Sequence, residues 1–325
     1  MAPFRLFRLP FLAKKEVVLH LVPLSRYNLY LCSAKTKFQI LNLEPNSRTF
    51  ELFINFDEQF VELKGIGKFH AKQLDLNDVV NDNREFQSQV VPIRQIGEDE
   101  FHSFWNVGAI RDGLHTIAMH FIDLLSLKLI KSINIGQGED DIPSLMWFLN
   151  CGAKVQSILF YPFGNRADAV GEIILSDAFL EKVEFNFSLF TPFSTQFEPT
   201  QFSGDKTVTI TLFLCAGAHW FKRKHLMAMN CSWFLISSCN LTSEDINTYL
   251  KTWGPRRKNE ERKFQIRLSE ECEAFSLEGI LEGIADPQNI NRTAPGKLSI
   301  KFYRGEVEME IELTNNNRHL EASLQ

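Results

Sequence analysis

Residues 4–41 read FRLFRLPFLAKKEVVLHLVPLSRYNLYLCSAKTKFQIL, and this is the most informative stretch of the chain. Leu9 precedes a proline, which favours extended backbone, and the apolar spacing after it predicts a helix from about Phe11. Pro23 suits the first position of a second helix, and Ser33 suits the N-cap of a third. Three helices of this size cannot bury their own apolar residues, so either the rest of the chain or another protein must cover them.

The apolar residues of this module recur at helical spacing, and its charge is basic. The sides expected to be covered carry, in successive helices, Phe11, Leu12, Val17, Val18 and Leu21; Leu24, Tyr27, Leu29 and Leu31; and Phe38, Ile40 and Leu41. Residues 1–45 hold seven Lys/Arg and two Asp/Glu, a formal charge of +5. The whole chain carries −5, which leaves about −10 for the remainder. A basic apolar module suits an acidic protein partner.

The segments RLPFL..KEV at 8–17 and NLYLCSAKTK at 28–37 resemble an F-box. More narrowly, they resemble the F-box of a large nematode family, the F-box B-like proteins, whose members carry an F-box-associated domain of type 2 behind the F-box. F-boxes dock on the acidic Skp-type adaptor of cullin–RING ubiquitin ligases. The resemblance therefore implies an adaptor role, with a Skp-type protein and, through it, a cullin as partners.

The resemblance also implies which side chains form the docking face or its support. These are Leu9, Pro10, Leu12, Val17, Leu21, Leu24, Leu29 and Leu31. One position departs from the family pattern, because Val22 stands where members usually have an aspartate before the proline of the second helix. The change removes a capping contribution of roughly 1 kcal/mol and leaves the apolar face intact.

Length and composition predict a folded chain of two domains. At 325 residues with 44% apolar residues, we expect a small domain at 4–45 and a larger one at 46–325. The 29 phenylalanines, against 5 tyrosines, indicate an aromatic core. The mild net charge provides no general field for binding nucleic acid, so no nucleic-acid partner is expected.

Cysteine usage and hydropathy point to an intracellular protein. The six cysteines include no C-x-x-C pair and suggest buried free thiols in a reducing compartment. Arginines interrupt the apolar N-terminus, which argues against a signal peptide. The longest apolar stretch, residues 210–221, is too short to span a bilayer. We expect a protein of the cytoplasm, the nucleus or both, with no membrane partner.

Residues 46–253 alternate between strand and helix patterns. Strands are expected at 50–56, 60–63, 131–135, 155–161 and 207–214, helices at 112–127, 143–152 and 177–183, and a polar surface loop at 75–100. This order predicts parallel βα units, which are leucine-rich-repeat-like by analogy since no strict consensus repeats. The expected fold class is α+β to α/β: a three-helix F-box, a larger α/β domain and a C-terminal β-hairpin.

The clearest motif of the larger domain lies at 225–254. Its segment NLTSEDINTYLKTW, at 240–253, opens with a capping box formed by Thr242 and Asp245. One helical face then carries Ile246, Tyr249, Leu250 and Trp253. This block resembles the most recognisable part of the nematode F-box-associated domain. The two motifs stand in the order that the family shows.

The C-terminal part predicts a strand at 264–268, a short helix within 275–284 and a hairpin of 298–302 with 307–313. In the second hairpin strand, apolar residues alternate with Glu306, Glu308, Glu310 and Glu312. We expect these glutamates to be solvated and to protect a sheet edge from aggregation, rather than to bind a ligand. Residues 314–325 are expected to fray.

The remaining candidates for catalysis, metal binding or phosphate binding are Cys231, Cys239, His219 and His225, the pair His115 and His120, the glycines at 136–138 and the basic cluster at 256–263. The cysteines and their neighbouring histidines fit no compact ligand spacing, and the cysteines suit the core because they lie in an apolar, strand-like run. The histidine pair is five residues apart, so the two do not share a helical face. The glycines lack a phosphate-loop lysine, and the basic cluster is interleaved with acids. We expect no catalytic residues, no cofactor and no metal.

These patterns predict a non-catalytic substrate-recognition subunit of an SCF-type ubiquitin ligase. It would dock through residues 4–45 and hold a protein substrate with residues 46–325, although no pattern assigns the substrate-binding residues. The alternative is a Skp-independent scaffold in which the helical module packs on the α/β domain. An enzyme would require a deep polar pocket with converging titratable groups.

Overall fold

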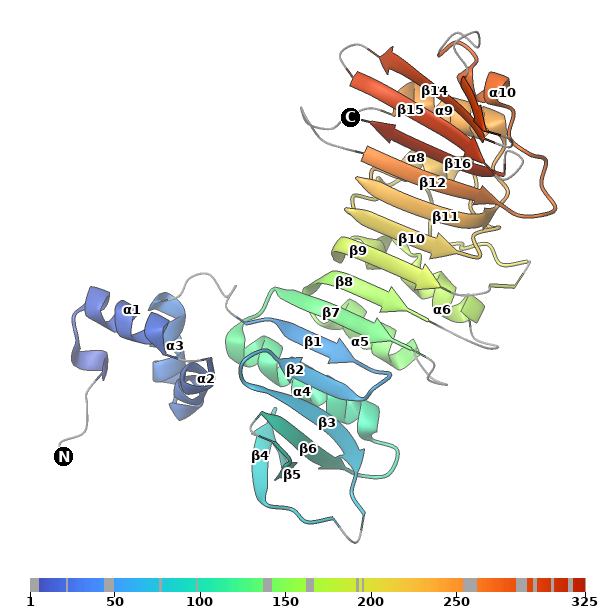
Figure 1. Ribbon diagram of the computed structural model, residues 1–325. Coiled ribbons are helices and arrows are strands. Elements are labelled where there is room, and N and C mark those ends of the chain that lie inside the picture. Colours follow the sequence, from blue (N-terminus) through green and yellow to red (C-terminus); the bar gives the residue numbers. More distant parts are fainter. Residues whose placement is uncertain are drawn as a thin grey trace. The chain divides into compact units, whose positions relative to one another are not determined.

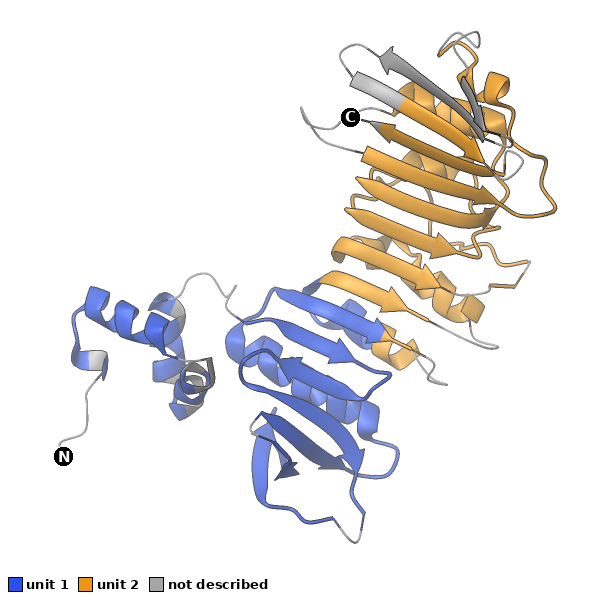
Figure 2. Cartoon of the chain, viewed as in Figure 1, with its two compact units in different colours: residues 1–134, 146–155 blue, residues 135–145, 156–325 orange. Residues whose placement is uncertain are grey.

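The computed structural model describes residues 6–21, 23–43, 50–75, 78–97, 99–136, 142–161, 167–190, 193–194, 196–253, 262–284, 291–294, 297–304, 307–314 and 318–324, some of them by backbone alone. The chain forms two compact units (Figure 2): Met1–Asn134 with Met146–Val155 (unit 1), and Ile135–Leu145 with Gln156–Gln325 (unit 2). Helices combine with parallel and antiparallel strands, so the expected α/β class is confirmed. The predicted domain boundary after residue 45 is not tested by these units and stays a prediction.

Unit 1 begins with a 3-10 helix, η1 (Leu6–Arg8), and three helices, α1 (Phe11–His20), α2 (Pro23–Cys32) and α3 (Ala34–Leu43). All three α-helices start where the sequence predicts. Pro23 is the first residue of α2, and the Ser33 hydroxyl accepts a hydrogen bond from the Thr36 amide at 3.1 Å ahead of α3. Val22, the departure from the F-box pattern, lies outside the described residues.

The rest of unit 1 is a mixed sheet with α4 (Ile110–Leu125) packed on it. The strand order is β7 (Leu129–Ile135), β1 (Leu52–Asn55), β2 (Phe60–Leu63), β3 (Gly67–Gln73), β6 (Glu100–Trp105), β5 (Gln89–Gln95) and β4 (Asp82–Phe86). The β7–β1 and β3–β6 pairs are parallel, and the others are antiparallel. Two further elements, α5 (Ile142–Asn150) and β8 (Lys154–Phe160), contribute residues to both units.

The expected surface loop at 75–100 is wrong. The stretch contains the antiparallel hairpin of β4 and β5, whose buried residues are Phe86, Val91 and Ile93. Gln87 and Ser88 form its turn with positive φ angles of 48° and 65°, where glycine or asparagine is the usual sequence signal. Because one strand face is polar and the turn lacks glycine, the local pattern resembles that of a loop.

Unit 2 contains α6 (Ala167–Ile174), α7 (Asp177–Leu180), α8 (Arg223–Ala228), α9 (Ser243–Thr252) and α10 (Leu277–Leu281). Its strands run in the order β9 (Val183–Phe190), β10 (Leu212–Ala216), β11 (Trp233–Cys239), β12 (Arg262–Leu268), β16 (His319–Leu324), β15 (Val307–Thr314), β14 (Lys297–Arg304) and β13 (Asn291–Ala294). Strands β9 to β12 are parallel, which confirms the predicted βα units, and the later pairs are antiparallel. Figure 1 shows the helices of unit 2 on one face of this sheet.

A row of phenylalanines fills the space between sheet and helices in unit 2. The register aligns Phe187, Phe213, Phe234 and Phe264 on four neighbouring strands, all with 0% exposure. The rings of Phe187 and Phe213 stack with centroids 5.0 Å apart, and those of Phe234 and Phe264 at 5.1 Å. Tyr249 of α9 meets the last two rings edge-on. The expectation of an aromatic core is confirmed here.

Two expected elements of unit 2 are misplaced by a few residues. The helix expected at 177–183 ends at Leu180, and its N-cap is Ser176, whose hydroxyl accepts a hydrogen bond from the Phe179 amide at 3.2 Å. Val183 instead starts β9, a strand that the sequence did not predict. The strand expected at 207–214 is β10, which starts only at Leu212. In both places an apolar run continues across an element boundary, so composition alone does not locate the boundary.

The C-terminal hairpin is confirmed as β14 and β15, but its surroundings differ from expectation. Residues 314–325 were expected to fray, yet β16 lies between β12 and β15 and pairs with both. Leu320 and Ala322 are fully buried, so a strand with few apolar residues is stabilised by its two neighbours. Strand β15 therefore lies inside the sheet, and the expectation that its glutamates protect an edge is wrong. The side chains of Glu306 and Glu308 lie outside the described residues.

Four of the six cysteines are buried free thiols, namely Cys151, Cys215, Cys231 and Cys239. Cys32 is exposed and Cys272 is half-buried, so the expectation of uniformly buried thiols is wrong for these two. Cys32 is the last residue of α2, where its side chain remains accessible.

Candidate functional site

The structure gives the predicted docking residues of the N-terminal helices unequal exposure. Pro10 and Leu12 are exposed, the latter by 73%. The half-buried residues are Leu9, Val17, Leu21 and Leu29. The side chains of Leu24 and Leu31 lie outside the described residues. The docking role of the whole predicted set stays a prediction.

Further apolar side chains are exposed beside this set. They are Phe11 at 56% and Leu19 at 42% on α1, and Phe38 at 66% on α3. Among the residues of α1, all of which the structure describes, Val18 alone is buried. The module thus presents exposed apolar side chains together with a formal charge of +5.

Two residues of the module, one on α2 and one on α3, contact α4 within unit 1. The Tyr27 ring lies edge-on to Phe121 with centroids 5.9 Å apart, and the Lys37 ammonium donates a hydrogen bond to the Asp123 carbonyl at 2.8 Å. Burial raises the pKa of Tyr27 to about 12. Helices α2 and α3 are therefore held to the α/β part of unit 1, while apolar residues of α1 stay accessible.

Unit 2 presents a second candidate surface, on the sheet face opposite its helices. The register aligns residues of six neighbouring strands in two rows that point to this side. From β9 to β15, the first row is Asn186, Leu212, Trp233, Lys263, Ser323 and Glu310. The second row is Ser188, Leu214, Leu235, Gln265, Glu321 and Glu312. We call these two rows the open face; its residues are half-buried, except Trp233, which is 41% exposed.

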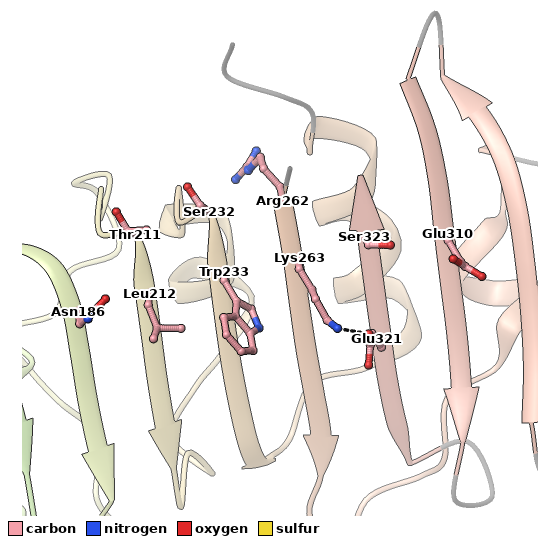
Figure 3. Close-up of a pocket in the computed structure, with 10 residues that line it drawn as sticks. All are labelled: Asn186, Thr211, Leu212, Ser232, Trp233, Arg262, Lys263, Glu310, Glu321 and Ser323. Carbon is pink, nitrogen blue, oxygen red and sulfur yellow. Dashed lines mark ion pairs between the residues drawn. The ribbon is translucent and has the colours of Figure 1, made fainter. Parts of the chain in front are cut away.

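The first row and its neighbours line a groove of about 700 Å³, shown in Figure 3. Trp233 lies near its middle, with Leu212 on the adjacent strand. The Lys263 ammonium forms an ion pair with Glu321 of β16, to which the Gln265 amide also donates at 2.8 Å. The face therefore has an apolar end over β10 and β11 and a charged end over β12, β16 and β15.

Of the cysteines and histidines considered for catalysis, Cys231, Cys239 and His225 lie in the core, and His219 is half-buried. Cys231 and Cys239 are buried, as predicted, and burial raises the pKa of Cys239 to about 12, which disfavours a thiolate. His225 is also fully buried, and burial lowers its pKa to about 4. Its Nδ1 accepts a hydrogen bond from the Lys222 amide at 3.0 Å. His225 of α8 and Cys239 of β11 are therefore packing residues, as is Cys231 in the segment between these two elements.

The histidine pair, the glycine stretch and the basic cluster were the other candidates, and the two histidines contact different aromatic side chains. His115 stacks on Trp147 with centroids 5.0 Å apart, whereas His120 lies edge-on to Phe86. Residues 137–138 of the glycine stretch and 256–261 of the basic cluster lie outside the described residues. In the part of the chain that the structure describes, no group of three or more His, Cys, Asp and Glu could hold a metal ion. The described helices include none that is long and apolar enough to cross a membrane.

Comparison with known proteins gives one match. A family model described as F-box associated matches residues 206–260. The described part of this segment holds β10, α8, β11 and α9, and it contains both Trp233 and the motif at 240–253. No curated protein and no solved structure matches the chain.

The match shows an F-box-associated domain within unit 2. Such a domain indicates, in general terms, substrate recognition in an F-box protein. The matched strands β10 and β11 supply the apolar end of the open face, whereas its charged end comes from β12, β16 and β15. The sequence analysis did not identify Trp233 as a surface residue. The alternation of strand residues identifies two faces but does not reveal which of them a helix covers.

Proposed function

We propose that this protein is a substrate-recognition adaptor of an SCF-type ubiquitin ligase, acting in the cytoplasm, the nucleus or both. The F-box-associated match at 206–260 carries the proposal. The exposed apolar residues of α1, on a module with a formal charge of +5, support docking of residues 4–45 on an acidic Skp-type protein. In this proposal the α/β domain holds the substrate. The resemblance to the nematode F-box B-like proteins supports the same adaptor role.

In this role the chain performs no chemistry of its own. It holds a substrate lysine near the ubiquitin-loaded enzyme and so raises the effective concentration of that lysine at the enzyme. Docking must then come from burial of apolar side chains, at roughly 1.5–3 kcal/mol for each large residue. Phe11 and Leu12, at 56% and 73% exposure, have most of this free energy still to gain.

The test is co-expression with the Skp-type proteins of the host, followed by size exclusion and an affinity measurement. We expect a one-to-one complex with the wild-type chain and binding at least ten-fold weaker for the double variant Phe11→Ala with Leu12→Ala. Val107→Ala is the matched control, because Val107 is 79% exposed but lies in the α/β part of unit 1. Full binding by a folded double variant, or equal loss in the control, would contradict the proposal.

A scaffold without a ligase is the second candidate, and the contacts of Tyr27 with Phe121 and of Lys37 with Asp123 favour it. They show that part of the helical module packs on its own chain. The same co-expression separates the two functions. A monodisperse chain that binds none of the Skp-type proteins would establish the scaffold.

A further inference from the structure

The sheet of unit 1 carries a group of cationic and imidazole side chains on the face opposite α4. Phe69 of β3 points toward α4, where the centroid of its ring lies 5.5 Å from that of Phe121. Successive side chains of a strand point to opposite faces, so His70 and Lys72 of β3 point away from α4. Both are half-buried rather than covered.

The strand register brings these two residues together with two from neighbouring strands. His70 lies directly opposite His102 of β6, and His102 lies directly opposite Arg94 of β5. The rings of the two histidines have centroids 5.7 Å apart. Lys72 is opposite Phe104, two residues along β6 from His102. We call Lys72, His70, His102 and Arg94 the basic patch.

The two permanent cations of the basic patch are unpaired. Within the described residues, neither Lys72 nor Arg94 forms an ion pair or a hydrogen bond. Lys68, on the same face, has a different environment, because Glu62 and Glu100 lie directly opposite it on the two neighbouring strands. The basic patch therefore holds positive charge that no in-register carboxylate balances.

His102 lies between the two cations and can add a third charge. Burial and, next, the charge of Lys72 lower the pKa of His102 below its usual range. The charges of His70 and Arg94 act in the same direction, and only Glu100, whose Oε1 lies 3.0 Å from Nε2 of His70, opposes them among these neighbours. The imidazole is thus mainly neutral near pH 7, and an anion placed over it would favour its protonation.

We infer that the basic patch binds an acidic segment of the substrate protein, with one carboxylate beside Lys72, a second beside Arg94, and His102 between them. An acidic segment supplies the negative charge that this part of the sheet lacks. The inference rests on the proposed function in taking the segment to belong to the substrate.

The strand order sets the spacing of the two carboxylates. Strands β3, β6 and β5 are neighbours, so Lys72 and Arg94 are two strand spacings apart, or about 10 Å. They are also offset by two residues along the strands, or about 7 Å, which gives a separation of about 12 Å. An extended segment covers this distance in about four residues.

Nucleic acid is the other polyanion that such cations attract, and the aromatic neighbours of the basic patch disfavour it. Single-stranded nucleic acid binds by stacking its bases on accessible aromatic rings. Phe104 is only 4% exposed, and the Lys68 ammonium lies 3.8 Å from the centroid of the Phe60 ring and covers it. The formal charge of the chain, −5, also disfavours nucleic acid.

The experiment is selection of a phage-displayed library of random 12-residue peptides on the full-length chain, followed by fluorescence polarisation with enriched peptides that lack histidine. We expect sequences with two Asp or Glu within about four positions. The double variant Lys72→Gln with Arg94→Gln should bind them about five-fold more weakly. Lys206→Gln with Lys222→Gln is the matched control, because it removes the same charge from two lysines that already form ion pairs with glutamates.

The role of His102 is tested by pH. Peptide carboxylates stay ionised between pH 8 and pH 6, whereas His102 gains protons as the pH falls, so binding to the wild-type chain should tighten. Glutamine cannot gain this charge, and His102→Gln should therefore reduce the pH dependence of binding.

Two further measurements separate binding from folding. Loss of two unpaired cations should leave the melting temperature of the double variant equal or higher. Peptides with Asn for Asp and Gln for Glu should lose binding to the wild-type chain. No enriched acidic family, full binding by the double variant, or tighter binding of a 12-nucleotide oligo-dT would overturn the inference.

Skp-type binding is measured separately and should be unchanged in the double variant. A chain that binds acidic peptides but no Skp-type protein refutes the proposed function and leaves the basic patch standing. A chain that binds a Skp-type protein but no acidic peptide refutes the basic patch alone.

Discussion

Helices α1 and α9 are both ten residues long, and the sequence predicts an apolar side for each. In α9, Ile246, Tyr249 and Leu250 are all buried against the phenylalanine row or its neighbours. In α1, Val18 alone is buried and Leu12 is 73% exposed. The apolar residues of α9 gather on one side, whereas those of α1 are spread around the helix, contrary to the expectation for α1. Helix α9 can therefore stabilise its domain, and α1 presents apolar surface.

The N-terminal caps of the two helices also differ, and α9 again has the more stabilising arrangement. The Thr242 hydroxyl accepts a hydrogen bond from the Asp245 amide at 3.2 Å, and the Asp245 carboxylate accepts one from the Thr242 amide at 2.9 Å, which completes the predicted capping box of α9. The N-cap of α1 is Pro10, which makes no side-chain capping bond. We conclude that α9 is specified by its own sequence and its core contacts. Helix α1 contributes less to folding, and its apolar residues are available to a partner.

The largest effect is expected in α9. Leu250→Ala should lower the free energy of unfolding by about 2–5 kcal/mol, because it removes a fully buried side chain and leaves a cavity. Urea denaturation of the full-length chain measures this loss. A loss below about 1 kcal/mol would mean that α9 is not part of the stabilising core, and the comparison with α1 would fail.

Histidines sharpen the comparison through pH. Burial lowers the pKa of His225 on α8 to about 4, below the value near 6.5 expected in the unfolded chain. The unfolded chain therefore binds a proton at His225 more tightly than the folded chain does. Above pH 6.5 both states are neutral there and the full free energy of unfolding is retained. As pH falls toward 4, protonation of the unfolded chain lowers the free energy of unfolding by roughly 3 kcal/mol.

Urea denaturation at pH 7 and pH 4.5 tests this dependence. His225→Gln should reduce the pH dependence of stability. Leu12→Ala on α1 removes no titratable group and should leave the pH dependence unchanged. Equal pH dependence in the wild type and His225→Gln would refute the assignment.

The capping box should give a smaller effect. Thr242→Ala removes the hydroxyl that accepts from the Asp245 amide and should cost about 1 kcal/mol. Thr242→Ser retains the acceptor and serves as the control in thermal melts. Equal melting temperatures for the two variants would show that the cap does not contribute to the stability of α9.

The smallest effect on stability is expected in α1. Leu12→Ala should change the free energy of unfolding by no more than about 0.5 kcal/mol, since the side chain is largely in solvent already. The same denaturation assay used for Leu250→Ala provides the direct comparison. A loss comparable with that of Leu250→Ala would show that α1 is covered in solution.

Prediction from sequence succeeded where the signal is local. The starts of α1, α2 and α3, the capping box and apolar face of α9 and the β14–β15 hairpin all follow from residues close together in the chain. It failed for the β4–β5 hairpin, whose Gln87–Ser88 turn carries no glycine. It failed again for β16, whose few apolar residues become a strand only because β12 and β15 pair with it.

The sequence by itself determined the helical module, the α/β character and the resemblance to F-box-associated proteins, because caps, periodicity and short motifs act over a few residues. Tertiary structure decided which apolar residues are covered and which charges meet. Asn186 and Glu310 share one row of the open face only through five strand pairings, in the order β9, β10, β11, β12, β16 and β15. Such pairings join distant segments and depend on packing of the whole sheet, so no local pattern specifies them.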